Sequence, residues 1–208
     1  MKKKIVFLVV CLLIAIATLC VGCAGNGATV VRESVTDENG VVYTLFKSTE
    51  NGKTDTYVAV TDYTGEENAQ YKPLVNVVVK SEIEIGGTVY PVTKISEMAF
   101  YSKKIETITV GENVKEIDPF VFAYSTASRI DLPSTVTAIK DYAFVNCLNL
   151  RELVVKSVTP PALGEYVFKC YVEKNNAYAI NSVLSVKVPT DCKDTYLNAW
   201  SEYGSIIK

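Results

Sequence analysis

Val92-Thr-Lys-Ile95 returns 22 residues later as Val114-Lys-Glu-Ile117 and again as Val136-Thr-Ala-Ile139. Val158 continues the same spacing of valines. A phenylalanine follows five residues after each isoleucine, and an apolar-x-apolar triplet comes next; these are Phe100, Phe122 and Phe144, then Ile108-Thr-Val110, Ile130-Asp-Leu132 and Leu153-Val-Val155. A fixed period of this length predicts a solenoid, because one coil cannot bury its apolar face without its neighbours.

The triplets predict one short strand per coil, with side chains that alternate between the two faces of a sheet. The apolar members of the triplets should point inward. The residues between and before them should point outward and form a surface; they are Thr107, Thr109, Arg129, Asp131, Glu152 and Val154. Rows of outward side chains on a repeat sheet are suited to extended partners, so these six residues are the predicted partner-binding face.

The phenylalanine of each coil is expected on one helical turn. Ser96 and Asp118 stand where a helix N-cap would, and Pro119 follows at the first helical position. The sequence therefore predicts a mixed α/β, β-rich solenoid of about three to four coils over residues 92–189.

Residues 30–91 contain short apolar runs separated by turn residues. Asn39-Gly40, Asn51-Gly52 and Gly86-Gly87 mark three turns between strands. We expect an antiparallel β unit here that covers the exposed end of the first coil.

The C-terminal segment, residues 190–208, predicts a capping helix. Tyr196, Trp200, Tyr203 and Ile207 are spaced as one helical face, with Thr190 or Asp191 as the cap. Before it, the polar and aperiodic stretch Glu173–Asn181 predicts a protruding loop.

Residues 1–22 have the layout of a secretory signal, with three lysines before an apolar run. Small residues precede Cys23, which predicts a lipoprotein whose Cys23 is acylated and anchored to the membrane. Ordinary signal cleavage and an uncleaved anchor helix are the alternatives. Residues 23–29 would be a flexible tether. The expected location is the cell envelope, outside the cytoplasm.

Charge argues against nucleic acid as a partner. Removing residues 1–22 takes away three lysines and no acids, which leaves 18 basic and 23 acidic residues and a formal net charge of −5. No basic cluster is present that could neutralise phosphates.

The coils resemble the BspA-type leucine-rich repeats of bacterial surface proteins. The resemblance rests on Ile-x-x-x-Ala-Phe (residues 95–100 and 139–144), Ala143-Phe-Val-Asn-Cys147, Leu132-Pro-Ser-Thr-Val136 and Thr159-Pro-Pro-Ala-Leu-Gly164. The first two coils are a residue shorter than the usual repeat and lack its Asn-Cys pair. The resemblance implies a right-handed solenoid on a secreted or surface-anchored protein, in a family commonly linked to adhesion and to binding host or bacterial partners.

The sequence contains no histidine, which excludes Ser-His-Asp and Cys-His catalysis and histidine-ligated metals. Carboxylate pairs such as Glu82 with Glu84, or Asp131 with Glu152, are ordinary for strand surfaces. Asp37-Glu-Asn-Gly40 resembles a calcium loop but lacks the downstream ligands, so a hairpin turn is expected there. We predict no enzyme, no cofactor and no metal.

Three cysteines remain beyond Cys23, at positions 147, 170 and 192. Cys147 and Cys170 are one coil apart, so a disulfide between them is geometrically feasible. The preferred interpretation is that Cys147 is a small buried side chain of the stack.

The predicted function is therefore a non-catalytic surface lipoprotein that binds an extracellular or envelope protein, for adhesion or host interaction, through the solenoid sheet. The alternative is a carbohydrate-binding module in which tyrosines stack on sugar rings. Its candidates lie in or near turns: Tyr101, Tyr124, Tyr171 and Tyr178.

Overall fold

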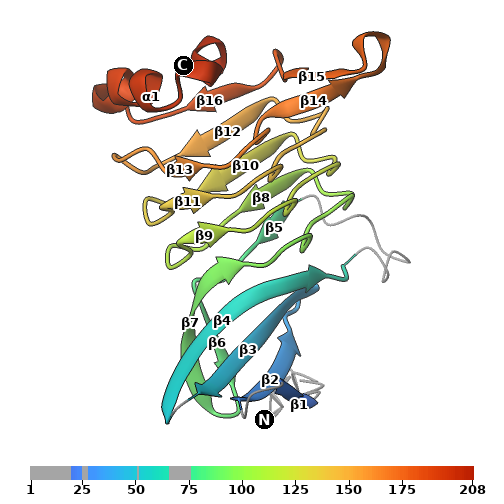
Figure 1. The fold of residues 1–208 in the computed structure, drawn as a ribbon, viewed down its shortest axis with the longest axis vertical. Helices are drawn as coiled ribbons and strands as arrows, with labels where there is room; N and C mark the ends of the chain where they lie inside the picture. Colours follow the sequence, from blue (N-terminus) through green and yellow to red (C-terminus); the bar gives the residue numbers. More distant parts are fainter. Residues whose placement is uncertain (1–19, 25–27, 51, 66–75) are drawn as a thin grey trace, which may run out of the picture.

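A computed structural model describes residues 20–24, 28–50, 52–65 and 76–208. The fold is β-rich with few helices, as predicted. In Figure 1 a curved antiparallel sheet occupies one half of the molecule and short strands from successive repeats stack in the other.

Two parallel ladders run through the stacked repeats. One is a five-stranded sheet in the order β16-β12-β10-β8-β5, built from β5 (Asn76–Val78), β8 (Thr107–Thr109), β10 (Arg129–Leu132), β12 (Glu152–Val155) and β16 (Ser185–Lys187). The other continues from β7 (Thr88–Ile95) through β9 (Glu116–Ile117), β11 (Ala138–Ile139) and β13 (Ala162–Leu163). Each repeat thus contributes one strand to each ladder.

The core between the ladders contains the residues that the period singles out. The six apolar triplet residues are all buried, and so are Val92, Val114 and Val136. Val158 is instead 67% exposed. Phe168 follows Phe144 by 24 residues, so the third repeat is longer than the first two and the valine spacing fails there.

A column of buried rings passes through the whole stack. Phe100, Phe122, Phe144 and Phe168 follow one another at centroid distances of 5.6, 5.1 and 5.6 Å. Tyr63 extends this aromatic column at the N-terminal end, 5.8 Å from Phe100. Stacked and tilted rings at these distances add attraction to the burial of large apolar surfaces.

The phenylalanine segments are not helical turns, so that expectation was wrong. Alternate amides donate to the next repeat: Phe100 N to Val121 O at 2.9 Å and Phe122 N to Ala143 O at 2.9 Å. An α-helix would use those N–H groups internally. Stacking offers them a partner in the neighbouring repeat, and this outweighs the local capping signals at Ser96 and Asp118.

This turn geometry places several residues in a strained backbone conformation. Seven residues of these turns have a left-handed conformation with φ between 55° and 61°, namely Met98, Ser102, Phe120, Tyr124, Tyr142, Asn146 and Tyr166. Bulky side chains rarely adopt it. The amides of all but Tyr166 donate hydrogen bonds to the next repeat, which hold these residues in that conformation.

The N-terminal sheet contains β1 (Cys20–Ala24), β2 (Ala28–Thr36), β3 (Val41–Glu50) and β4 (Lys53–Tyr63), each antiparallel to the next. The expected turns at Asn39-Gly40 and Gly86-Gly87 are present, and β6 (Glu82–Ile85) pairs with β7 across the second; Asn51 of the other expected turn lies outside the described residues. The antiparallel prediction is incomplete, however. β4 pairs with β7 in parallel, and β5 joins the repeat sheet through β8.

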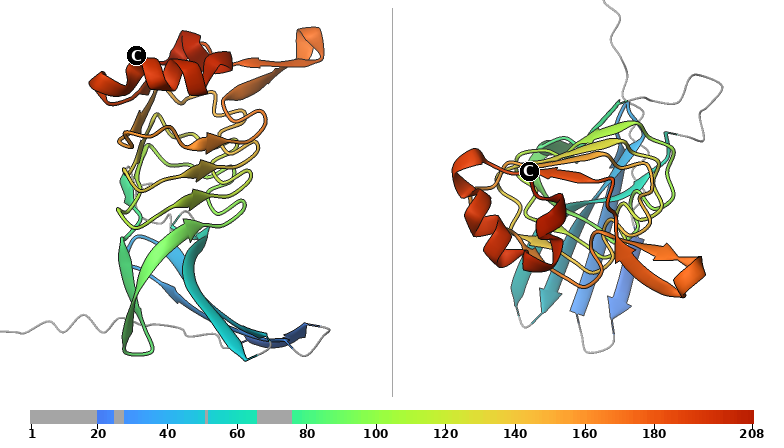
Figure 2. Two further views of the ribbon diagram at one scale, coloured as in Figure 1. Left: turned by 60° about the vertical axis from the view of Figure 1, so that its left-hand side comes forward. Right: turned by 90° about the horizontal axis from the view of Figure 1, so that it is seen from above.

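A short helical segment covers the far end of the repeats (Figure 2). It consists of the 3₁₀ turn η2 (Thr190–Cys192), α1 (Lys193–Ala199) and the 3₁₀ helix η3 (Ser201–Ile206). The four residues of the predicted face are buried. No side chain caps the start of η2 or α1, so neither Thr190 nor Asp191 has the predicted role.

Three contacts fix this segment to the last repeat. The Tyr196 hydroxyl donates to Ser157 O at 2.7 Å, and the Trp200 indole N–H donates to Pro161 O at 2.9 Å. Tyr203 packs edge-on against Phe168, with centroids 5.1 Å apart. The segment therefore closes the aromatic column at the C-terminal end.

The stretch expected to be a loop is a hairpin. β14 (Lys169–Val172) pairs antiparallel with β15 (Ala177–Ile180), and the turn η1 (Glu173–Asn175) ends at Asn176 in the left-handed conformation. Figure 2 shows this hairpin projecting from the side of the repeats. The antiparallel pairing gives the polar stretch its order.

Candidate functional site

The six residues of the predicted binding face lie together on the outer side of the five-stranded sheet. Their registers place Thr107, Arg129 and Glu152 in one row and Thr109, Asp131 and Val154 in the next. Their side chains are exposed or half-buried. We name this surface, with its extensions on β5 and β16, the sheet face.

The extensions continue both rows by one strand in each direction. Asn76 and Ser185 extend the first row, and Val78 and Lys187 extend the second. Val78 is 50% exposed, although it is an apolar strand residue. The sheet face thus carries ten side chains of mixed chemistry in two parallel rows.

Arg129 is the electrostatic centre of the sheet face. Its guanidinium forms ion pairs with Asp131, at 2.9 Å, and with Glu152 on the neighbouring strand. The two carboxylates beside the guanidinium, Asp131 first and then Glu152, raise the pKa of Arg129. We name these three residues the Arg129 triad. A partner can add hydrogen bonds to the guanidinium without removing an isolated charge from water.

A second ion pair borders the sheet face at its end. Lys156, directly after β12, approaches Glu112 at 3.1 Å, and both side chains are largely exposed. At the start of β8, Thr107 donates to the amide oxygen of Asn76 on the edge strand β5 at 2.5 Å. Contacts within the sheet face thus hold the Arg129 triad and the Thr107–Asn76 pair, whereas the buried Ser185 hydroxyl oxygen has no hydrogen-bond partner among the described residues.

The turns of the repeats carry a second ordered surface, formed by rings. Phe120, Tyr142 and Tyr166 stack face to face at 4.9 and 5.1 Å with parallel planes. Tyr178 of the hairpin packs edge-on against Tyr142 and Tyr166, at 6.3 and 5.1 Å. Phe120 and Tyr166 thus cover the two faces of Tyr142, and the Lys169 amino group lies 4.6 Å from the centre of the Tyr166 ring.

The other tyrosines considered for sugar stacking are also engaged. Tyr101 and Tyr124 are tilted against each other at 5.4 Å, and Tyr171 packs edge-on against Tyr178 at 5.5 Å. The Tyr171 hydroxyl donates to the Asn176 side chain at 2.6 Å. The four tyrosines considered for sugar stacking thus form two contacting pairs, Tyr101 with Tyr124 and Tyr171 with Tyr178.

The Asp37 turn is a structural hairpin. Its carboxylate accepts from the amides of Asn39 and Val41, at 2.9 and 3.0 Å, and from the Tyr43 hydroxyl at 3.0 Å. Tyr43 in turn accepts from the Lys80 amide at 2.9 Å. Burial raises the pKa of the Tyr43 phenol. Within the part of the chain that the structure describes, no cluster of acids and cysteines is arranged to bind a metal ion.

Cys147 is a buried side chain of the stack, as expected. It is 1% exposed, is not in a disulfide, and its thiol donates to Phe122 O at 2.9 Å. Burial raises its pKa to about 12. Cys170 and Cys192 are also free and are half-buried.

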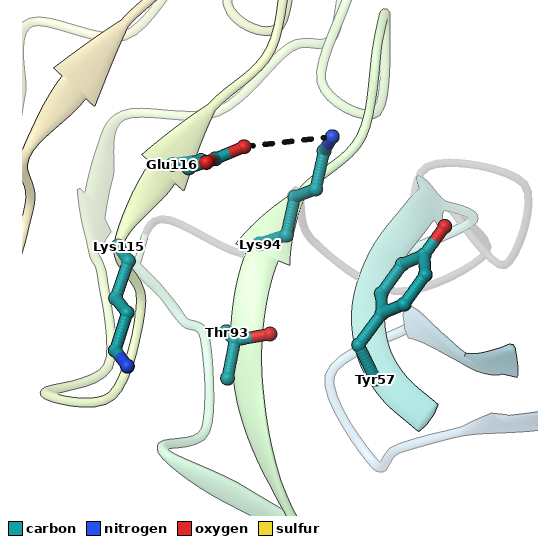
Figure 3. A pocket seen from close by; sticks show the side chains of 5 residues that line it. All are labelled: Tyr57, Thr93, Lys94, Lys115 and Glu116. Atoms are coloured by element: carbon teal, nitrogen blue, oxygen red, sulfur yellow. Dashed lines mark ion pairs between the residues drawn. The ribbon is translucent and has the colours of Figure 1, made fainter. Parts of the chain in front are cut away.

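A pocket of about 410 Å³ lies on the opposite ladder, at the junction of the N-terminal sheet and the repeats (Figure 3). It is lined by Tyr57, Thr93, Lys94, Lys115 and Glu116. Lys94 forms ion pairs with Glu116 at 3.7 Å and with Asp118 at 3.0 Å.

Six copies of the BspA type leucine rich repeat region match residues 93–198, about half of the 208 residues. The chain belongs to this family. No curated protein sequence matches the chain.

Among solved structures, the chain is similar to a leucine-rich repeat protein from Bacteroides capillosus, with 18% identity, a TM-score of 0.49, and coverage of 81% of this chain and 98% of that one. It is also similar to the pneumococcal vaccine antigen PcpA (13% identity, TM-score 0.40, 77% of this chain and 51% of that one). A third is a leucine rich cell surface protein from Faecalibacterium prausnitzii (12%, TM-score 0.26, 82% and 65%).

Sequence reasoning missed three parts of this BspA-type surface. The pairing of β5 with the repeat sheet was not predicted, because Asn76–Val78 lies outside the 22-residue period. The stacked rings at Phe120, Tyr142 and Tyr166 share the position two residues before each core phenylalanine, a signal that the sequence does contain. The pocket joins residues from three strands, and no local pattern predicts it.

The predicted signal at residues 1–22 lies mostly outside the described residues. In the described part, no helix is long and apolar enough to cross a membrane. The structure pairs Cys20–Ala24 with β2 and starts β2 at Ala28, whereas the sequence predicts a tether over 23–29. Acylation of Cys23 stays a prediction.

Proposed function

We propose that this BspA-type protein is a non-catalytic surface protein that binds a protein partner through the sheet face. The observation that carries the proposal is the pair of in-register rows centred on the Arg129 triad. Such a surface offers hydrogen-bond donors and acceptors at strand spacing, about 4.8 Å, to an extended segment or a second sheet.

We further propose the arrangement around this surface. The repeats form a right-handed solenoid of about three to four coils, residues 30–91 and 190–208 close its ends, and Cys23 carries the lipid that holds it to the envelope. A lipid anchor would place the sheet face outside the cell. Adhesion, or contact with a host or envelope protein, is the role that fits such a position.

Size sets the expected strength of binding. Five short strands span roughly 19 Å by 13 Å, or roughly 250 Å². Standard interfaces bury roughly 800 Å² on each partner. We therefore expect a partner that also contacts the bordering Glu112–Lys156 pair, or a weak interaction strengthened by many copies on one surface.

The test is affinity capture with a charge-reversed sheet face. The full-length chain is solubilised and used to capture proteins from envelope and extracellular-matrix extracts, and the captured protein is then purified for titration. The variant reverses the Arg129 triad as a unit, with Arg129→Glu, Asp131→Lys and Glu152→Lys. This reversal keeps opposite charges next to each other, so the fold should be retained.

The matched control reverses an exposed ion pair of the N-terminal sheet, with Lys53→Glu and Asp55→Lys. We expect the triad variant to bind the purified partner at least about tenfold more weakly and the control to bind like the wild type; tenfold corresponds to about 1.4 kcal/mol. Equal affinity of the triad variant and the wild type would contradict the proposal.

A further inference from the structure

The pocket at the junction has an aromatic wall that the sheet itself builds. Arg32, Phe46 and Tyr57 are direct cross-strand neighbours on β2, β3 and β4. The guanidinium lies 5.4 Å from the Phe46 ring centre, and Phe46 stacks on Tyr57 at 4.9 Å with planes 13° apart. One face of Tyr57 is thus covered, and its other face is turned away from Phe46.

The uncovered face of Tyr57 is turned toward the pocket, because β7 is the neighbour of β4 on that side. Tyr57 is 42% exposed, and its hydroxyl has no hydrogen-bond partner in the described ranges. Figure 3 shows Tyr57 on one side, Thr93 and Lys94 on the middle strand, and Glu116 and Lys115 on the far side. β4 and β9 lie on either side of β7, and the pocket over these three strands has a volume of about 410 Å³, enough for one saccharide ring.

The charged side chains of the pocket differ in whether they already have an ion-pair partner. Lys94 is held between Glu116 and Asp118, and together they present a fixed donor beside fixed acceptors. Lys115 is exposed and has no carboxylate partner among residues 20–24, 28–50, 52–65 and 76–208. An ammonium without a partner at the rim of a pocket favours an anionic group on the ligand.

We propose that this pocket binds a hexuronate, the acidic sugar unit of a polysaccharide. The C–H face of the ring would pack on the open face of Tyr57 and the carboxylate would pair with Lys115. The hydroxyls would bond to Thr93, Lys94 and Glu116. An aromatic acid could use Tyr57 and Lys115 but would gain no hydrogen bonds to Thr93, Lys94 or Glu116, so we expect it to bind more weakly.

This saccharide site is independent of the sheet face. It lies on the other ladder, and none of its five lining residues belongs to the two rows of the sheet face. The protein could therefore hold a polysaccharide on one side and a protein on the other.

Saturation-transfer NMR on the purified full-length chain tests the proposal. The probes are the methyl glycosides of glucuronic, galacturonic and mannuronic acid, with their carboxyl-reduced counterparts and phenylacetate. At about 10 mM probe, a Kd of about 1 mM would fill most sites. We expect transfer to ring protons of at least one uronate, at least about fivefold weaker transfer to its reduced counterpart, and less transfer to phenylacetate.

Three variants locate the binding. Tyr57→Ala should abolish transfer, and Lys115→Ala should weaken uronate binding to the level of the reduced sugar. Tyr124→Ala removes a tyrosine of similar exposure, 49%, from a distant turn and should change nothing. Absence of transfer from all three uronates, retention of transfer in Tyr57→Ala, or stronger transfer to phenylacetate would each overturn the proposal.

Discussion

Arg129 is placed so that it could serve the proposed binding function while contributing little to stability. Its ion pairs with Asp131 and Glu152 lie at the surface, where such pairs contribute little to folding. The buried neighbours of the same strand, Ile130 and Leu132, carry the stabilising contacts. Alternation along a strand separates the two roles by a single residue.

Replacing Arg129 with alanine should therefore leave the fold intact. We expect the free energy of unfolding to fall by no more than about 1 kcal/mol in urea denaturation. Ile130→Ala, one position along, should cost about 2–5 kcal/mol because it leaves a cavity in the core. A larger loss for Arg129→Ala than for Ile130→Ala would show that the ion pairs hold the strand.

Cys147 provides a chemical test of burial at the residue scale. Its pKa is raised to about 12 by burial, so the reactive thiolate is scarce at pH 8. We expect iodoacetamide at pH 8 to leave Cys147 unmodified in the native protein and to modify it in urea, as measured by peptide mass spectrometry. Modification in the native state at the unfolded rate would place this thiol at the surface.

At the scale of elements, the stack depends on one ring from each repeat. Phe122 lies between Phe100 and Phe144 and is fully buried. Phe122→Ala should lower the free energy of unfolding by about 3–5 kcal/mol, measured in urea. Phe122→Leu keeps most of the apolar volume and should cost less; an equal loss for both variants would mean that ring stacking dominates over cavity formation.

Gly40 and Gly52 in the N-terminal sheet allow the energetic cost of a positive φ to be distinguished from that of steric crowding. Gly40 and Gly52 both have positive φ, at 83° and 76°, but only at Gly40 would an added Cβ meet backbone, 2.5 Å from Gly65 N. Gly40→Ala should therefore destabilise the protein by at least about 1 kcal/mol more than Gly52→Ala, by thermal denaturation. Equal effects would indicate that Gly65 moves away at little cost.

The sequence predicts elements well where one rule acts alone. The 22-residue period identified the buried phenylalanines and triplets because burial in a stack depends on spacing. The capping signals at Ser96 and Asp118 wrongly predicted helical turns around Phe100 and Phe122, because hydrogen bonds between repeats outweigh these local signals. The prediction of a loop at Glu173–Asn181 was wrong for a related reason. The hairpin there forms by pairing with Lys169–Val172, and the polarity of the stretch does not reveal this pairing.

The candidate site likewise has one part that the sequence predicts and one part that it does not. The outward positions of Arg129 and Glu152 follow from strand alternation, and the structure brings them into contact. The pocket beside Tyr57 depends on the parallel contact between β4 and β7, residues far apart in the sequence. Tertiary contacts of this kind leave no periodic signal.

At the scale of the whole molecule, several buried phenols and a buried thiol make the fold sensitive to alkali. Burial raises the pKa of Tyr196 and of Tyr203 to about 12. An unfolded tyrosine ionises near pH 10. Between about pH 10 and pH 12 the unfolded chain therefore loses protons that the folded chain keeps, and stability falls as pH rises.

We expect the melting temperature to hold steady below about pH 9 and to fall from about pH 10 upward. Tyr196→Phe and Tyr203→Phe should each reduce the slope of this fall, and Tyr124→Phe, on an exposed side chain, should not. A melting temperature that stays constant from pH 8 to pH 12 would contradict the burial of these phenols.

Site-specific photocrosslinking tests the central claim, that the sheet face binds a protein, most directly. A photoreactive amino acid replaces Thr109 in the middle of the sheet face, and in a second variant Thr137 beside β11 on the other ladder. Both are produced in the native organism and irradiated. We predict a discrete protein adduct from position 109, absent from position 137 and lost when the Arg129 triad is reversed; adducts from position 137 alone would contradict the account.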